Sequence, residues 1–139
     1  MRAAIIVFPG SNCDHDAYHV LKKILNKNVD FVWHKESNLN NYDFILIPGG
    51  FSYGDYLRAG AIARFSPIMD EVIKAANAGI PIMGICNGFQ ILIESGLLPG
   101  ALINNINVKF LSQNIVLKVA STNSIFTKNL DLNQELMMP

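Results

Sequence analysis

The sequence GICNG at residues 84–88 places Cys86 between two glycines, where a predicted strand, Ile82–Ile85, meets a predicted helix, Gly88–Ser95. A sharp strand-to-helix turn is the form of a nucleophile elbow, in which flanking glycines avoid clashes around a strained backbone. A helix N-terminus favours the reactive thiolate, and the backbone N–H of Asn87 can point at an oxyanion. The alternative is an inert buried cysteine between two glycines, but the strand–turn–helix context favours a nucleophile.

Outward from this turn, short apolar runs alternate with helical patterns. Ala3–Phe8 is a continuous apolar run of the kind that parallel sheets bury on both faces, and two further strands are predicted at Val29–Trp33 and Phe44–Ile47. Pro67–Ala78 is a predicted helix, with proline suited to its first turn and Gly79 as its stop. Strands that alternate with helices predict an α/β fold with an open, mostly parallel sheet.

A further helix is predicted directly after the first strand, with Ser11 or Asn12 as its cap. Five apolar residues recur at the spacing of one helical face: Ala17, Val20, Leu21, Ile24 and Leu25. After Gly100 the pattern changes, and two strands without an intervening helix are predicted at Ile106–Leu111 and Ile115–Ala120.

Three segments directly follow predicted strands: Pro9–Cys13, Pro48–Gly54 and Cys86–Gly88. Because ligands bind beyond the carboxyl ends of the strands in open α/β sheets, these segments should converge on one rim. The two-glycine turn in the second segment exposes backbone N–H groups that can bind an oxyanion. Alone it is an ordinary tight turn, but beside the elbow the backbone of Gly50 and Phe51 is a candidate second oxyanion donor.

The composition limits the possible functions. The 139 residues fit one domain over 1–139, and a hydrophobic content of 50% supports a sizeable core. Eleven basic and eleven acidic residues cancel, so there is no electrostatic footprint for nucleic acid or an anionic membrane. No apolar run approaches the ~20 residues of a membrane span. Two cysteines are too few for a disulfide framework and lack zinc-site spacing. We therefore expect a cytoplasmic protein without a metal.

Four segments of the chain together resemble a known family. IPGGFSYGDYLRAGAIAR at 47–64 and GICNGFQ at 84–90 closely resemble the glutaminase subunits of phosphoribosylformylglycinamidine synthases. FPGSNCD at 8–14 and LLPG at 97–100 match the same subunits. The elbow alone marks the wider class I glutamine amidotransferases, and the longest segment narrows the resemblance to these subunits. The resemblance covers the chain end to end and weakens after Phe110.

The resemblance implies a flavodoxin-like class I glutamine amidotransferase fold, with helices on both faces of the sheet. It implies hydrolysis of glutamine, with ammonia passed to a separate ATP-dependent synthetase subunit that makes formylglycinamidine ribonucleotide in purine biosynthesis. ATP and magnesium would bind to that partner, a small accessory subunit would join the complex, and this chain would hold no cofactor.

Site residues follow from the same resemblance. Cys86 would attack the glutamine side-chain amide and form a glutamyl thioester. Asn87 and the backbone of Gly50 and Phe51 would line the oxyanion hole. Gln90 would help to hold the substrate, and helix geometry agrees, because it lies one turn after Cys86.

The sequence departs from the family pattern in one respect. The family completes its triad with a His-x-Glu pair well C-terminal to the cysteine, but no histidine follows His34 in these 139 residues. A cysteine nucleophile needs a base to activate it and an acid to protonate the leaving amine. We therefore expect an N-terminal portion of the domain, with the C-terminal part missing, that is inactive alone.

Two other functions stay open. One is a stand-alone cysteine hydrolase or thiol-dependent stress protein, since related α/β folds also carry a cysteine elbow. The other is a non-catalytic binding subunit, an alternative that the missing His-x-Glu pair allows.

The remaining polar residues have simpler interpretations. His15 and His19 have metal-like spacing without a third ligand, so a surface pair is expected, although His15 is the one local candidate for a substitute base. Cys13 is expected to pack rather than react. An interface with the synthetase is the preferred use for Arg58 and Arg64, and solvated arginines are the alternative.

Overall fold

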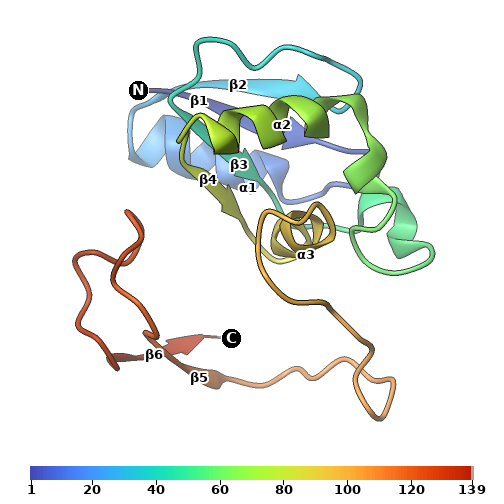
Figure 1. The fold of residues 1–139 in the computed structure, drawn as a ribbon, viewed down its shortest axis with the longest axis vertical. Coiled ribbons are helices and arrows are strands. Elements are labelled where there is room, and N and C mark those ends of the chain that lie inside the picture. The colour runs from blue at the N-terminus through green and yellow to red at the C-terminus, as the bar shows by residue number, and fades with distance from the viewer. Residues whose placement is uncertain (139) are drawn as a thin grey trace. The chain divides into compact units, whose positions relative to one another are not determined.

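The computed structural model of the chain describes residues 1–138 (Figure 1). The chain divides into two compact units, residues 1–102 and 103–139. The first unit contains a parallel sheet in the order β2-β1-β3-β4, built from β1 (Arg2–Val7), β2 (Asn28–Trp33), β3 (Phe44–Ile47) and β4 (Ile82–Gly84). This order is that of the first four strands of flavodoxin-like sheets, so the predicted open parallel sheet is confirmed.

Helices cover both faces of the sheet, as predicted (Figure 1). Alternate residues of a strand point to opposite faces, and β1 uses both. Its residues Ala4 and Ile6 join a buried cluster with α2 (Pro67–Asn77) and α3 (Asn87–Glu94). Its odd-numbered residues pack with α1 (Asp14–Tyr18) and η1 (His19–Ile24). No helix among the described residues is long and apolar enough to cross a membrane.

The first helix departs from its predicted pattern. The α-helix α1 passes into a π-helix, η1, after which the N–H of Leu25 donates to the carbonyl of Val20 at 2.9 Å. The wider π turn breaks the spacing of 3.6 residues per turn, so Leu21 is buried while Val20, Ile24 and Leu25 are exposed. The predicted side-chain cap is also wrong, because no side chain hydrogen-bonds to the start of α1.

The second unit contains an antiparallel pair, β5 (Ile115–Lys118) and β6 (Glu135–Met138). The predicted strand at 115–120 is confirmed in its first part. The predicted strand Ile106–Leu111 is wrong, because a turn closes there with Val108 at a φ of 53° and its N–H on the carbonyl of Asn105 at 2.8 Å. The strand that pairs with β5 is instead β6, near the C-terminal end of the sequence, in a short run that contains no turn residues.

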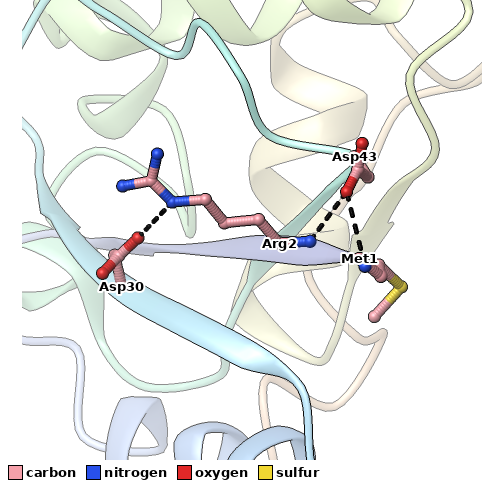
Figure 2. A network of polar contacts seen from close by, with 4 residues as sticks. All are labelled: Met1, Arg2, Asp30 and Asp43. Atoms are coloured by element: carbon pink, nitrogen blue, oxygen red, sulfur yellow. Dashed lines mark hydrogen bonds and ion pairs between the residues drawn. The ribbon is translucent and has the colours of Figure 1, made fainter.

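A polar network ties the amino ends of the strands together (Figure 2). Figure 2 shows Arg2 of β1 between two carboxylates, with its Nε 2.8 Å from Asp30 of β2 and its backbone N–H 2.7 Å from Asp43. The N-terminal amine of Met1 lies 3.7 Å from the same carboxylate of Asp43. These partners are largely exposed, so the ion pairs contribute little stability. The network lies opposite the carboxyl ends of the strands, where the candidate site lies.

Candidate active site

Cys86 lies at the turn between β4 and α3 in a strained backbone conformation. It is the N-cap residue of α3, with φ 52° and ψ −111°, and its side chain is exposed. A positive φ in a residue other than glycine costs of order 1–3 kcal/mol and persists only where the surrounding structure enforces it. This geometry is that of a nucleophile elbow, so the predicted strand–turn–helix context of Cys86 is confirmed.

Gly84 and Gly88 permit the close packing that enforces this turn. A Cβ on Gly88 would overlap the carbonyl oxygen of Ile47 at the end of β3, and would lie 2.7 Å from its carbonyl carbon. A Cβ on Gly84 would lie 2.6 Å from the carbonyl carbon of Gly88. The N–H of Ile85 also donates to the Ile47 carbonyl, at 3.0 Å. The two glycines are therefore required because α3 begins directly against the end of β3.

The two-glycine turn after β3 packs against the loop after β1. Gly50 has a φ of 142°, and a Cβ there would lie 2.7 Å from the backbone nitrogen of Asn12. The N–H of Phe51 donates to the carbonyl of Gly10 at 2.9 Å. The N–H of Phe51 is therefore engaged in this structure, whereas the N–H of Gly50 has no acceptor within residues 1–138.

Gly49 lies between the two cysteines. A Cβ on Gly49 would lie 3.3 Å from the Cβ of Cys86 and 3.4 Å from the Sγ of Cys13. These contacts bring the ends of β1, β3 and β4 together, so the predicted convergence on one rim is confirmed. The thiol of Cys13 donates to the side chain of Asn12 at 3.2 Å. Burial raises the pKa of the Cys13 thiol, which keeps it in its less reactive protonated form.

Asn87 fastens the short helix η2 (Ser52–Asp55) to the start of α3. The side chain of Asn87 is buried; its Oδ1 accepts the Ser52 N–H at 3.1 Å, and its Nδ2 donates to Asp55 at 3.3 Å and Gln90 at 3.0 Å. Burial raises the pKa of the Asp55 carboxyl. As the first residue of α3, Asn87 has a backbone N–H with no partner inside the helix. The structure therefore brings the predicted residues Asn87 and Gln90 together beside Cys86.

The loop after η2 is tied to the other end of α3. The guanidinium of Arg58 donates twice to the carboxylate of Glu94, at 2.6 and 2.7 Å. These hydrogen bonds are the main reason that the pKa of Glu94 is lowered. Arg64 lies over the ring of Phe65, 4.9 Å from its centre. The predicted contact of Arg58 and Arg64 with a synthetase stays a prediction.

The two histidines of the first helix do not form a metal site with their surroundings. His15 is 84% exposed; its Nε2 lies 4.0 Å from the Asp14 carboxylate, and its ring lies 5.2 Å from that of Phe31. In the described part of the chain, no three side chains of His, Cys, Asp or Glu are placed to hold a metal ion.

Sequence analysis missed a buried polar chain beside the site. The hydroxyl of Tyr53 lies 2.8 Å from Nδ1 of His34 and 2.8 Å from Oγ of Ser66, and both partners are buried. With Lys35 and three apolar neighbours, these residues line a pocket of about 470 Å³. Only the position of Tyr53 inside the family stretch 47–64 could have indicated a role for it, because its partners lie far away in the sequence.

Burial, reinforced by the charge of Lys35, lowers the pKa of His34 from its ordinary value of 6.5. Between the two pKa values the unfolded chain binds a proton that the folded chain does not. The contribution of neutral His34 to the free energy of unfolding is therefore complete above pH 6.5 and is lost as the pH falls through the pKa of the folded chain. We expect the free energy of unfolding in urea to decrease below pH 6.5, less steeply in His34→Gln. His15→Gln, at an exposed position, controls for the loss of one histidine. An unchanged slope in His34→Gln would contradict this.

Comparison with known proteins identifies the class of protein. Residues 1–139 match the family model of the CobB/CobQ-like glutamine amidotransferase domain. The chain therefore belongs to this family of glutamine amidotransferase domains. More particularly, it is similar to a chain in the structure of PurLQS from Thermotoga maritima, with 47% sequence identity and a TM-score of 0.90. The alignment covers 99% of this chain and 64% of that chain, so this chain spans about two thirds of its relative's length.

A second solved structure supports the fold alone. A glutamine amidotransferase from Thermotoga maritima shares 17% sequence identity and a TM-score of 0.50, over 99% of this chain and 58% of that chain. The family match and the PurLQS relative confirm the resemblance drawn from residues 47–64 and 84–90. They also confirm the flavodoxin-like class I glutamine amidotransferase fold.

Proposed function

We propose that this chain carries the nucleophile half of a glutaminase that hydrolyses glutamine and supplies ammonia to a synthetase subunit in purine biosynthesis. The strained, exposed Cys86 at the start of α3 is the observation that carries this proposal. The family match and the relative with 47% identity support the glutamine substrate over other amides.

The proposed chemistry assigns one role to each rim residue. The thiolate of Cys86 attacks the side-chain carbonyl carbon of glutamine, and the oxyanion that forms is stabilised by backbone N–H groups. The N–H of Asn87, which has no partner inside α3, and the N–H of Gly50 supply these donors. The N–H of Phe51 holds the turn on the Gly10 carbonyl instead. Collapse of the tetrahedral intermediate needs a proton on the leaving nitrogen, which the distal histidine of the family would supply; it then releases ammonia and leaves a glutamyl thioester, which water hydrolyses to glutamate. Gln90, held by Asn87 at 3.0 Å, helps to orient the substrate.

The ammonia acceptor in this proposal is an ATP-dependent synthetase subunit that makes formylglycinamidine ribonucleotide. The similarity to a chain of PurLQS supports an assembly of this kind. ATP and magnesium bind to the synthetase, a small accessory subunit joins the complex, and the assembly works in the cytoplasm. No observation favours a stand-alone cysteine hydrolase or a non-catalytic binding subunit over this function.

The test is selective alkylation of Cys86. A chloroketone analogue of glutamine should modify one thiol of the chain, because the rim holds the analogue beside an exposed nucleophile. Glutamine should protect that thiol and asparagine, shorter by one methylene, should not. Intact mass and peptide mapping measure the modified residue.

Two variants serve as controls for this experiment. Cys86→Ser should abolish the modification, and Cys13→Ser should retain it, since Cys13 is the other cysteine of the chain. Modification of Cys13 instead, or equal protection by asparagine and glutamine, would argue against a glutamine site and for a less selective cysteine hydrolase.

A further inference from the structure

The turn that follows β3 is held in an unfavourable backbone conformation. Within η2, Tyr53 has a φ of 53°, Gly54 of 67° and Asp55 of 55°. Left-handed residues other than glycine, here Tyr53 and Asp55, persist only when surrounding contacts enforce them. The contacts that enforce this turn therefore decide where the Gly50–Phe51 backbone lies.

One set of contacts comes from Asn87 and a second comes from the Tyr53 side chain. The Tyr53 hydroxyl occupies the centre of a buried chain, 2.8 Å from both His34 Nδ1 and Ser66 Oγ. Its ring packs edge-on against the His34 ring, with centres 5.6 Å apart. His34 directly follows β2, and Ser66 directly precedes α2. The turn is thus anchored to two elements that carry none of the proposed catalytic groups.

The neutral state of His34 is compatible with the hydrogen bonds that join His34, Tyr53 and Ser66. Burial favours neutral imidazole, and with its proton on Nε2 the ring leaves Nδ1 as an acceptor. In that tautomer Tyr53 donates to His34 and Ser66 donates to the oxygen of Tyr53; with the proton on Nδ1, His34 donates to Tyr53 and Tyr53 donates to Ser66. Both hydrogen bonds of the Tyr53 hydroxyl form in either tautomer, and together they fix the rotamer of Tyr53.

The turn also contacts the residue that follows the nucleophile Cys86. The backbone N–H of Ser52, next to Tyr53, donates to Oδ1 of Asn87 at 3.1 Å, and Asn87 is the residue after Cys86. The backbone N–H of Tyr53 donates to the Pro9 carbonyl at 2.7 Å, which ties the turn to the loop after β1. A displacement of Tyr53 would therefore move both sides of the oxyanion site, which are the start of α3 at Asn87 and the Gly50–Phe51 backbone.

We propose that His34, Tyr53 and Ser66 are positioning residues that hold the oxyanion side of the site through one buried hydrogen-bonded chain. This inference rests on the proposed function of Cys86. The three residues touch no substrate; they fix the turn whose backbone lines the site.

The experiment compares two electrophiles on Cys86 in the 139-residue chain. The chloroketone analogue of glutamine develops an oxyanion during attack, whereas iodoacetamide reacts by direct displacement and needs no oxyanion hole. In Tyr53→Phe we expect kinact for the analogue to fall roughly tenfold, the effect of leaving buried hydrogen-bonding partners unsatisfied. KI for the analogue should stay the same, and the iodoacetamide rate should stay within about twofold.

Matched variants separate positioning from general loss of stability. Tyr56→Phe makes the same change three residues away, where the side chain is exposed, and should leave all rates unchanged. His34→Asn keeps an acceptor near the position of Nδ1 and should retain more of kinact than His34→Leu. Equal losses in His34→Asn and His34→Leu, or a parallel loss of both electrophile rates in Tyr53→Phe, would overturn the proposal.

A second readout decides the inference without substrate. Amide hydrogen exchange at residues 50–55 and 87 should be faster in Tyr53→Phe than in Tyr56→Phe, because the turn loses its anchor. If glutamine fails to protect wild-type Cys86, the proposed function is wrong. The exchange rates still show whether the hydrogen bonds between His34, Tyr53 and Ser66 hold the turn. Unchanged exchange in Tyr53→Phe would overturn the positioning role.

Discussion

A chain of these 139 residues should release ammonia from glutamine roughly 10⁴–10⁶-fold more slowly than a family member that has the distal His-x-Glu pair. Cys86 has the elbow that a nucleophile needs, but no histidine follows His34 in the sequence. In the family that distal histidine would protonate the leaving ammonia and activate water on the thioester, so both steps should be slow without it. Ammonia release, measured against Cys86→Ala as background, tests this expectation, while alkylation of Cys86 should still proceed.

Two further arms make this result decisive. Addition of the synthetase partner should not restore turnover, because a partner can order a site without supplying the missing base. His15→Gln should also change nothing, since the His15 side chain is 84% exposed and lies against Phe31 of β2. Near-normal ammonia release that Cys86→Ala abolishes and His15→Gln reduces would contradict the expectation and make His15 a substitute base.

The elements around the elbow could be predicted because local sterics fix them. Gly84 and Gly88 are readable in the sequence as flanking glycines, and the structure shows the backbone contacts that exclude a Cβ at both positions. The inner strands β1 and β3 could be predicted because they are buried on both faces and therefore apolar at consecutive positions. The change from α-helix to π-helix at η1 could not be predicted, since the residues that form a π turn also fit the spacing of an α-helix.

The site could be predicted only where its residues follow a strand or lie one helical turn apart. Cys86, Asn87 and Gln90 meet these conditions, and the structure joins the last two through a hydrogen bond of 3.0 Å. The chain through His34 and Tyr53 could not be predicted, because these residues are 19 positions apart and lie on elements that only the folded sheet brings together. Phe51 was expected to offer its N–H to an oxyanion, but that N–H donates to Gly10, which only the packing of two loops determines.

Gly88→Ala should destabilise the chain by about 3 kcal/mol or more and should nearly abolish reaction of Cys86 with the glutamine analogue. Helix propensity alone predicts the opposite sign, since alanine in a helix is favoured over glycine by about 1 kcal/mol. The clash dominates, because the new Cβ would overlap the carbonyl oxygen of Ile47, a backbone atom that cannot rotate away. Relief requires α3 to move off β3, and Cys86 moves with it. Urea unfolding measures the first effect and alkylation under folding conditions the second.

Gly96→Ala separates this clash from the ordinary cost of replacing glycine. Gly96 follows α3 with a φ of 72°, and a Cβ there would have no neighbour within 4 Å, so its replacement carries backbone strain without overlap. That strain should cost about 1–2 kcal/mol and leave the reactivity of Cys86 intact. If Gly88→Ala were as stable as wild type, or lost stability without losing reactivity, the contact between α3 and Ile47 would not be what fixes the elbow. A loss of both in Gly88→Ala, beside a loss of stability alone in Gly96→Ala, ties the strained backbone of Cys86 to that single contact.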